Sequence, residues 1–238
     1  MNDDKSAKPD IKGNYSKILA EINSTALACG RNPKDIKLIA VSKTKPIEYV
    51  KEAILGGAKD FGENRPQELK AKFDEINSHS DCDLRWHQIG HLQKNKVKYV
   101  VGRAALIHSL DSLELAAEID KKAKQLEIVQ DVLIQVNISG EESKFGISEE
   151  ELGGFIERLK GFSNINLKGL MTISVKDYSR EQNRELFGRL KELAEQYGVR
   201  ELSMGMTNDF KEAIEAGATM IRVGTAIFGA RDYGVQNQ

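Results

Sequence analysis

The first long apolar run of the sequence is Ile36-Lys37-Leu38-Ile39-Ala40-Val41-Ser42, and it continues directly into Lys43-Thr44-Lys45-Pro46. A short run rich in apolar and β-branched residues is typical of a strand in a parallel sheet that is covered on both faces. A dinucleotide-binding sheet requires a glycine-rich loop after its first strand, and this junction contains no glycine. The P-loop pattern is also absent from the sequence. The stretch therefore favours a parallel β/α fold other than these two nucleotide-binding folds.

Seven further runs of this kind follow, and segments of helical period separate them. The eight predicted strands are Ile36–Ser42, Ala58–Gly62, Leu84–Gly90, Ala104–Ser109, Val129–Ile138, Ile165–Ile173, Glu201–Gly205 and Thr219–Gly224. An extra amphipathic helix is predicted at Ile11–Cys29, and Asp111–Gln125 and Ser148–Leu159 are examples of the helices between strands. Eight such units without a linker predict a single (β/α)8 barrel of the TIM type. We expect the barrel to occupy residues 11–233, between flexible tails at residues 1–10 and 234–238.

The composition indicates a globular protein without a strong overall charge. The 238 residues include 35 Lys and Arg against 36 Asp and Glu, so the net charge is −1 and attracts neither nucleic acid nor an anionic membrane. The N-terminus lacks the basic and apolar parts of a signal peptide, and no run approaches the ~20 apolar residues of a transmembrane helix. Cys29 and Cys82 have no recognisable pair spacing. We expect a cytoplasmic protein with reduced thiols.

Polar residues gather at the C-terminal ends of the predicted strands. In a barrel of this type these ends share one rim, where active sites lie. The residues at the ends are Lys43, Glu63, Asn64, His87, His108, Asn137, Met171, Ser203, Met204, Arg222, Gly224 and Thr225. A structural role explains each of them singly, because strand ends are commonly polar, but it explains their convergence less well. We therefore predict a functional site at this rim.

Lys43 is the candidate nucleophile of this site. It ends the first strand, so its side chain lies either in solvent at the rim or in the mouth of the barrel. In the mouth, desolvation would lower the pKa of the amine and make it a competent imine-forming group. Lys45 lies beside Pro46, the expected first residue of a helix, and we expect its side chain in solvent.

The ends of the last two strands form a candidate phosphate site. Gly205 and Gly224 permit a close approach of the backbone to a ligand, and Ser203 and Thr225 offer hydroxyl donors. Barrels often bind phosphate at this place with backbone amides. The alternative is a pair of ordinary strand-to-helix turns, with Asp209 or Asn208 as a helix N-cap. That alternative leaves the paired glycines unexplained.

Two other motifs carry less weight. His87 and His91 are four residues apart, as in a helical zinc motif, but Gln88 follows His87 and Gly90 ends the strand, so no metal site is predicted. The basic run at residues 94–98 contains no aromatic residue, although Tyr99 follows it. We expect it to be a solvated helix face and not a nucleic-acid contact.

Six segments of the sequence carry a resemblance to a known family. They are Ala40–Lys45, Phe61–Asn64, Trp86–Lys96, Lys168–Met171, Leu202–Met206 and Ile221–Gly229. Because these segments occur in this order over residues 11–233, the chain resembles the pyridoxal phosphate (PLP) homeostasis proteins. Those proteins share the barrel of the alanine racemase N-terminal domain. The resemblance implies a PLP-binding protein of vitamin B6 homeostasis. Such a protein would hold the cofactor as an imine on Lys43 without turning over a substrate.

The resemblance also implies roles for further residues. The positions that hold the cofactor phosphate match Ser203, Gly224 and Thr225. Arg222 matches an arginine that faces the pyridine nitrogen. The residues that match positions close to the cofactor ring are Asn64, His87 and Met204.

The chain departs from the family pattern at three places. Arg65 and Pro66 follow Asn64, where a tyrosine is common in the family. Gln88 stands where a phenylalanine is common, and Thr207 replaces a frequent serine. These differences concern the rim and not the lysine or the phosphate site.

Two alternative functions remain open. A PLP-dependent amino-acid racemase is the first, but alanine racemases take a second base from an extra β domain of the partner subunit, and this chain ends before such a domain. A barrel enzyme for phosphorylated sugars, with Lys43 as an aldolase-type amine, is the second. We expect a monomer without appreciable catalytic activity, whose partners are PLP and, in addition, PLP-dependent apo-enzymes.

Overall fold

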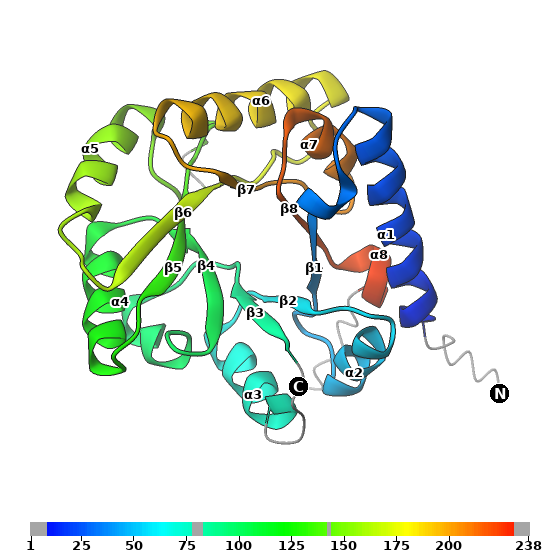
Figure 1. The fold of residues 1–238 in the computed structure, drawn as a ribbon, viewed down its shortest axis with the longest axis horizontal. Helices are drawn as coiled ribbons and strands as arrows, with labels where there is room; N and C mark the ends of the chain where they lie inside the picture. The colour runs from blue at the N-terminus through cyan, green and yellow to red at the C-terminus, as the bar shows by residue number, and fades with distance from the viewer. Residues whose placement is uncertain (1–8, 78–82, 142–143, 231–238) are drawn as a thin grey trace, which may run out of the picture.

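A computed structural model describes residues 9–77, 83–141 and 144–230 of the chain, and eight parallel strands in it close into a barrel (Figure 1). The strands are β1 Lys37–Val41, β2 Asp60–Glu63, β3 Arg85–Gln88, β4 Ala104–Leu110, β5 Gln130–Gln135, β6 Ile165–Met171, β7 Glu201–Ser203 and β8 Met220–Val223. They follow one another around the barrel in chain order, and β8 pairs with β1. The predicted (β/α)8 barrel and all eight predicted strands are confirmed.

Helices surround the barrel on the outside (Figure 1). They are α1 Ile11–Ala28, α2 Ile47–Leu55, α3 Pro66–Asn77, α4 Leu113–Gln125, α5 Glu149–Leu159, α6 Arg180–Gln196, α7 Phe210–Ala216 and α8 Thr225–Phe228, with 3-10 helices η1 Pro33–Asp35 and η2 Lys94–Tyr99. The predicted extra N-terminal helix is α1, which packs against α2, α7 and α8. Within the described ranges, none of these helices has both the length and the apolar character needed to cross a membrane.

Local sequence signals set the helix ends. Ser148 and Ser179 begin α5 and α6 with capping boxes, in which serine and a Glu or Gln three residues later satisfy each other's backbone N–H groups. Asp10 caps α1 by accepting a hydrogen bond from the N–H of Gly13. The tails predicted at residues 1–10 and 234–238 lie almost entirely outside the described residues, so the domain limits stay a prediction. Cys29 is exposed, and Cys82 also lies outside the described ranges.

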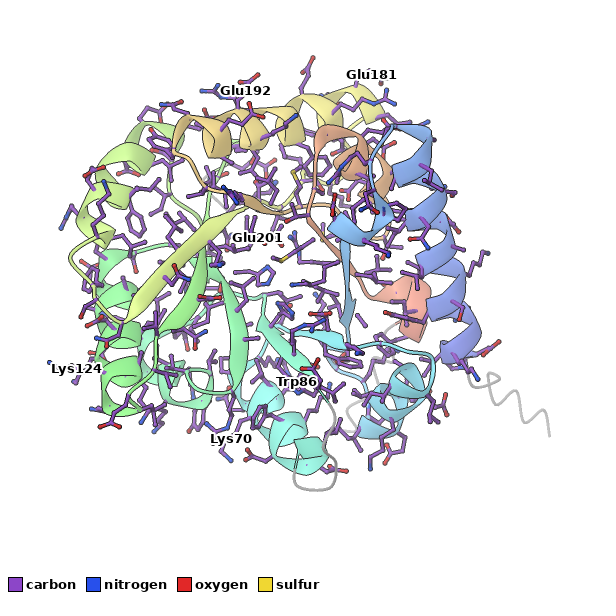
Figure 2. The ribbon with its side chains drawn as sticks, viewed as in Figure 1. Lys70, Trp86, Lys124, Glu181, Glu192 and Glu201 are labelled. Carbon is purple, nitrogen blue, oxygen red and sulfur yellow. The ribbon has the colours of Figure 1, made fainter. Side chains whose placement is uncertain are left out.

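Two apolar cores result from the alternation of side chains along the strands. The larger core fills the layer between barrel and helices, where Trp86 packs on Phe61 with ring centroids 5.4 Å apart. Charged side chains such as Lys124 and Glu192 point outward from the helices (Figure 2). The smaller core lies inside the barrel and consists of Ile39, Leu106, Leu133, Met171 and Met220. Since so few apolar side chains fill the interior, polar groups occupy part of it.

Candidate cofactor-binding site

The ends of β1 and β8 bring two predicted site segments together. The strands pair with Ala40 opposite Val223, so the residues that follow them leave the barrel side by side. A Cβ atom at Gly224 would lie 3.2 Å from the carbonyl oxygen of Val41, and this short distance shows how closely the two segments pack. Lys43, two residues further on, is partly buried at the mouth, and Thr225 is exposed there.

The backbone around Lys43 is held by α3. Lys72 donates a hydrogen bond of 2.7 Å to the carbonyl oxygen of Ser42, and the N–H of Thr44 donates one of 2.7 Å to Glu68. Lys72 and Glu68 are themselves paired at 2.8 Å. Thr44 has a φ of 62°, which a β-branched residue rarely adopts. The turn that carries Lys43 is therefore strained and held on both sides.

Glu63 completes this buried cluster beneath the turn. Its side chain is fully buried, and Oε1 accepts hydrogen bonds from Ser42 at 2.6 Å and from Lys72 at 2.7 Å. Burial raises the pKa of Glu63 to about 7, although the charge of Lys72 acts in the opposite direction. Oε2 finds no hydrogen-bond partner among the described residues.

Lys45 differs from the prediction. Its side chain is buried, and Nζ donates a hydrogen bond of 2.5 Å to the carbonyl oxygen of Ala230 and lies 5.8 Å from the centre of the Tyr49 ring. The predicted solvent exposure was therefore wrong. The long aliphatic stem of lysine can be covered while its ammonium group reaches a distant acceptor.

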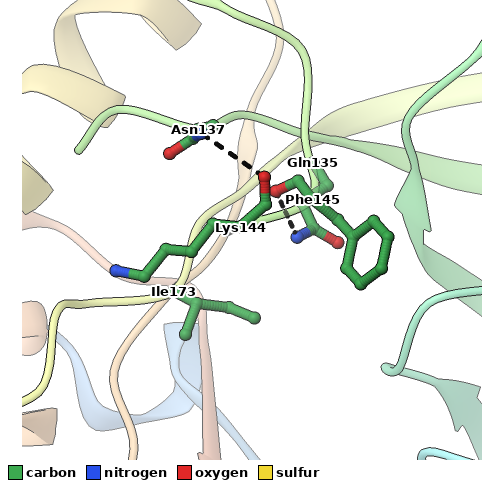
Figure 3. A pocket seen from close by; sticks show the side chains of 5 residues that line it. All are labelled: Gln135, Asn137, Lys144, Phe145 and Ile173. Atoms are coloured by element: carbon green, nitrogen blue, oxygen red, sulfur yellow. Dashed lines mark hydrogen bonds between the residues drawn. The ribbon is translucent and has the colours of Figure 1, made fainter. Parts of the chain in front are cut away.

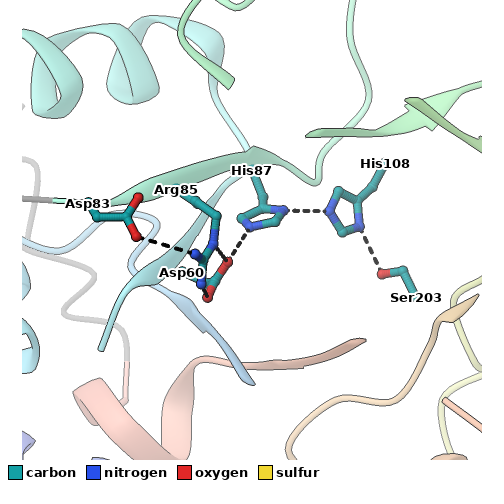
Figure 4. Close-up of polar contacts among 6 residues, drawn as sticks. All are labelled: Asp60, Asp83, Arg85, His87, His108 and Ser203. Atoms are coloured by element: carbon teal, nitrogen blue, oxygen red, sulfur yellow. Dashed lines mark hydrogen bonds and ion pairs between the residues drawn. The ribbon is translucent and has the colours of Figure 1, made fainter. Parts of the chain in front are cut away.

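A chain of hydrogen bonds crosses the inside of the barrel (Figure 4). Asp60 lies 3.0 Å from Nε2 of His87, whose Nδ1 lies 2.9 Å from Nε2 of His108. Nδ1 of His108 lies 2.8 Å from Oγ of Ser203, which accepts a hydrogen bond of 2.5 Å from Arg222. All five side chains are buried. We name them the interior chain.

Burial and hydrogen bonding set the charges of the interior chain. Burial alone would raise the pKa of Asp60, but hydrogen bonds from Arg85 at 2.7 and 2.8 Å and from His87 outweigh it and lower this pKa to about 2. Burial lowers the pKa of His87 and lowers that of His108 still further. At neutral pH both imidazoles are therefore neutral and Asp60 is ionised.

Arg222 is a buried cation whose pKa burial lowers to about 10. One end of its guanidinium donates to Ser203, and the other donates to the carbonyl oxygen of Thr172 at 2.9 Å. Within the described part of the chain it forms no ion pair with a carboxylate. A buried guanidinium with further N–H groups and no carboxylate partner fits an electron-rich acceptor such as a pyridine nitrogen.

The segment after β7 forms a tight turn at the predicted phosphate site. Gly205 has a φ of 87°, and a Cβ there would lie only 2.5 Å from the Cβ of Ala213. Asp209 begins α7, but its side chain accepts from the N–H of Met206 at 2.6 Å. Met204 is fully buried in the larger core, so a contact between its side chain and a cofactor ring stays a prediction.

Asn64 is partly buried at the end of β2. Its carbonyl oxygen accepts a hydrogen bond of 3.0 Å from the buried side chain of Gln88. A Cβ at Gly90 would lie 2.6 Å from the same oxygen, so only glycine fits beside this turn. Gln88, one of the departures from the family pattern, thus supports the backbone of a predicted site residue.

A small cavity of about 150 Å³ opens on the other side of the mouth (Figure 3). It is lined by Gln135, Asn137, Lys144, Phe145 and Ile173. His91 stacks on Phe145 with ring centroids 3.9 Å apart, and its Nδ1 lies 3.0 Å from Asp111. In residues 9–77, 83–141 and 144–230, no three His, Cys, Asp or Glu side chains are grouped to hold a metal ion.

Sequence reasoning placed His87 and His108 at strand ends but did not pair them, and it missed Asp60 and Arg85. A signal for Asp60 and Arg85 was present in the sequence, because these two charged residues begin β2 and β3, which are otherwise buried strands. The same reasoning missed Lys72, whose place on a helix of alternating charges resembles that of any solvated lysine.

The closed eight-stranded barrel with its flanking helices is the fold of the alanine racemase N-terminal class. In agreement, the family model described as alanine racemase, N-terminal domain, matches residues 20–232. The Pyridoxal phosphate homeostasis protein of Aquifex aeolicus is 45% identical over 224 residues, which are 92% of this chain and 97% of that protein. This chain belongs to the family of pyridoxal phosphate homeostasis proteins.

Solved structures agree with this assignment. The structure of PipY of Synechococcus elongatus without PLP superposes with a TM-score of 0.82 and 33% identity, covering 92% of this chain and 100% of that one. The structure of PipY with PLP bound gives a TM-score of 0.77 and 34% identity, covering 89% and 100%.

Proposed function

We propose that this protein binds PLP at the mouth of its barrel, with the cofactor aldehyde held as an imine by the amine of Lys43, and that it serves intracellular PLP homeostasis. The observation that carries the proposal is that the segment leading to Lys43 leaves β1 beside Gly224, at the end of the strand that carries the buried cation of Arg222. The PLP-bound structure of the relative PipY supports it.

Each predicted site residue has a proposed role. Gly224 and Thr225 would hold the phosphate, since the first N–H groups of α8 have no partner within the helix and Thr225 is exposed. Arg222 would donate to the pyridine nitrogen. Ser203 would also face the phosphate, as the resemblance implies, and the residues that would shape the ring end of the site are Asn64, His87 and Met204.

We further propose that the protein carries PLP and does not turn over amino acids. PLP catalysis is strongest when the pyridine nitrogen is protonated, usually beside an acidic residue. Arg222 is a cation at neutral pH, so it disfavours a second positive charge on that nitrogen. The ring would then be a weak electron sink.

Borohydride reduction tests the binding mode. The purified protein with bound PLP should show an absorption band in the visible range. After borohydride reduction, peptide mass mapping should place the pyridoxyl group on Lys43. Lys43→Ala should lose the band, whereas Lys45→Ala, the matched control, should keep it. A label mainly on Lys45 or on surface lysines would refute the assignment. A protein without a PLP chromophore would favour the sugar-phosphate alternative.

We also propose a cytoplasmic monomer that supplies PLP to apo-enzymes. Sedimentation at several concentrations tests the monomer, and fractionation of cells tests the location. Transfer to an apo-enzyme in the presence of a scavenger of free PLP tests direct delivery. A scavenger that abolishes transfer would contradict direct delivery.

A further inference from the structure

The two ends of the interior chain determine the direction of its hydrogen bonds. Arg222 can only donate, and the ionised carboxylate of Asp60 can only accept. His87 must therefore carry its hydrogen on Nε2, which faces Asp60 at 3.0 Å. Nδ1 of the same ring is then an acceptor, and it requires a hydrogen on Nε2 of His108, 2.9 Å away.

The directions of the remaining hydrogen bonds follow from the same assignment of donors and acceptors. His108, with its hydrogen on Nε2, has a bare Nδ1 that accepts the hydroxyl hydrogen of Ser203 at 2.8 Å. The Ser203 oxygen in turn accepts from Arg222 at 2.5 Å. All four bonds thus run in one direction, from Arg222 to Asp60. The single hydroxyl hydrogen of Ser203 is used inside the barrel and is not available to a phosphate oxygen.

Hydrogen bonds that run the other way between His87, His108 and Ser203 require one additional proton on His87. The proton would make His87 and then His108 donate toward Ser203, whose hydroxyl hydrogen would be released. Only Asp60, from β2, favours such a cation.

Burial and the neighbouring positive charges oppose the additional proton. For His87 these charges are Lys37 on β1 and Arg85 on β3. For His108 they are His87 itself, Arg222 on β8 and Lys37. The neutral arrangement therefore prevails at neutral pH.

We propose that Asp60, His87 and His108 are positioning residues that turn the Ser203 hydroxyl away from the phosphate and make its oxygen an anchor for Arg222. This inference rests on PLP as the ligand of the site. It moves the side chain of Ser203 from the phosphate end, where the resemblance placed it, to the ring end. Selectivity for the phosphorylated cofactor then falls to Gly224 and Thr225.

Histidine tautomers in the cofactor-free protein test the direction of the chain. Long-range ¹H–¹⁵N correlation spectra should show both His87 and His108 with hydrogen on Nε2 and a bare Nδ1. In Asp60→Leu, Nε2 of His87 would face an apolar side chain and the cation of Arg85, so the hydrogens should move to Nδ1 of both rings. Asp74→Leu removes an exposed carboxylate that also pairs with an arginine, and it should leave both tautomers unchanged.

A hydrogen on Nδ1 of His108 in the wild-type protein would overturn the proposal. Unchanged tautomers in a folded Asp60→Leu variant would also overturn it, since Asp60 would then not set the direction. The wild-type measurement stands even if that variant fails to fold. Neither measurement uses PLP, so failure of the proposed function leaves this test intact.

Ligand titration tests the consequence at the site. Ser203→Ala should weaken the binding of PLP and of pyridoxal by the same factor, because the lost hydroxyl supports Arg222. Thr225→Ala, the control at the phosphate end, should weaken PLP selectively, by about tenfold or more. A selective loss of PLP binding in Ser203→Ala would overturn the proposal. Absence of PLP binding in the wild-type protein would instead refute the proposed function.

Discussion

Lys72 donates a hydrogen bond of 2.7 Å to the backbone carbonyl oxygen of Ser42, the residue directly before Lys43. The same ammonium group lies 2.8 Å from Glu68, which accepts the N–H of Thr44 on the other side of Lys43. A helix outside the barrel thus holds the turn that presents the proposed cofactor lysine. This arrangement makes the geometry of Lys43 sensitive to residues that do not touch the site.

Lys72→Met should destabilise the protein in a pH-dependent way. Removing one partner of a buried ion pair costs about 3–5 kcal/mol when the other partner stays charged. Glu63 loses its cation, so its pKa should rise further and protonation should relieve part of the cost. We therefore expect a larger loss of unfolding free energy in urea at about pH 8 than at about pH 5.

Lys70→Met is the matched control for this variant. Lys70 is on the same helix, but its pair with Asp74 is exposed, so the variant should differ from wild type by about 0.5 kcal/mol or less. Equal losses at both pH values in Lys72→Met would contradict the coupling to Glu63.

Glu63→Gln should remove a pH dependence of stability. The pKa of Glu63 is raised from 4.5 to about 7 in the folded state, so its contribution is fully present below the unfolded value and is lost as pH rises through about 7. By linkage, the wild-type protein should lose about 3 kcal/mol relative to Glu63→Gln over this window. Urea unfolding at a series of pH values measures the difference. Parallel stability curves would show that Glu63 titrates normally.

Thr44→Gly should stabilise the fold and weaken cofactor binding. Glycine relieves a left-handed conformation that costs a non-glycine residue about 1–3 kcal/mol, and part of the gain is lost to unfolded-state entropy of about 0.5–1 kcal/mol. Glu127→Gly is the control, because Glu127 has a similar φ of 55°. Thermal unfolding should show a higher stability for both variants. PLP titration should show a lower affinity only for Thr44→Gly. Equal PLP affinity in the two variants would contradict a role for the strained turn.

Alanine at the two glycines of the predicted phosphate site should have different effects. Gly205→Ala combines a positive φ with a contact of 2.5 Å and should cost about 2–4 kcal/mol of stability. Gly224 has a φ of −116°, so Gly224→Ala should cost about 1 kcal/mol or less but should weaken PLP binding. Urea unfolding and PLP titration separate the two effects. Tight PLP binding in a folded Gly224→Ala variant would place the phosphate elsewhere.

The PLP-loaded protein should not racemise or transaminate amino acids appreciably. In the proposed binding mode, the fixed charge of Arg222 would keep the pyridine nitrogen unprotonated and weaken the electron sink. Incubation with alanine or serine, followed by chiral chromatography, measures the activity, and Lys43→Ala is the control. Turnover near the enzyme median of ~10 per second that is lost in Lys43→Ala would make this protein an enzyme.

The eight strands and the extra N-terminal helix could be predicted from the sequence because their signals are local. A run such as Ile36–Ser42 is apolar at almost every position, and a helix such as Ile11–Ala28 repeats its buried residues with helical period. Boundaries were less accurate, since several predicted strands extend into the turns. The strand order of a β/α barrel then determines which strand ends are neighbours, so the closeness of the segments after β1 and β8 could be predicted as well.

The interior chain depended on the tertiary structure. His87 and His108 lie in strands covered on both faces, where the apolar pattern does not show which side chains point into the barrel. The other members of the interior chain come from β2, β7 and β8, and Ser203 is 95 residues away from His108 in the sequence. Local propensity therefore determines the elements of this protein. The register of the closed barrel decides which buried polar groups meet, because a buried donor or acceptor is stable only where another strand supplies its partner.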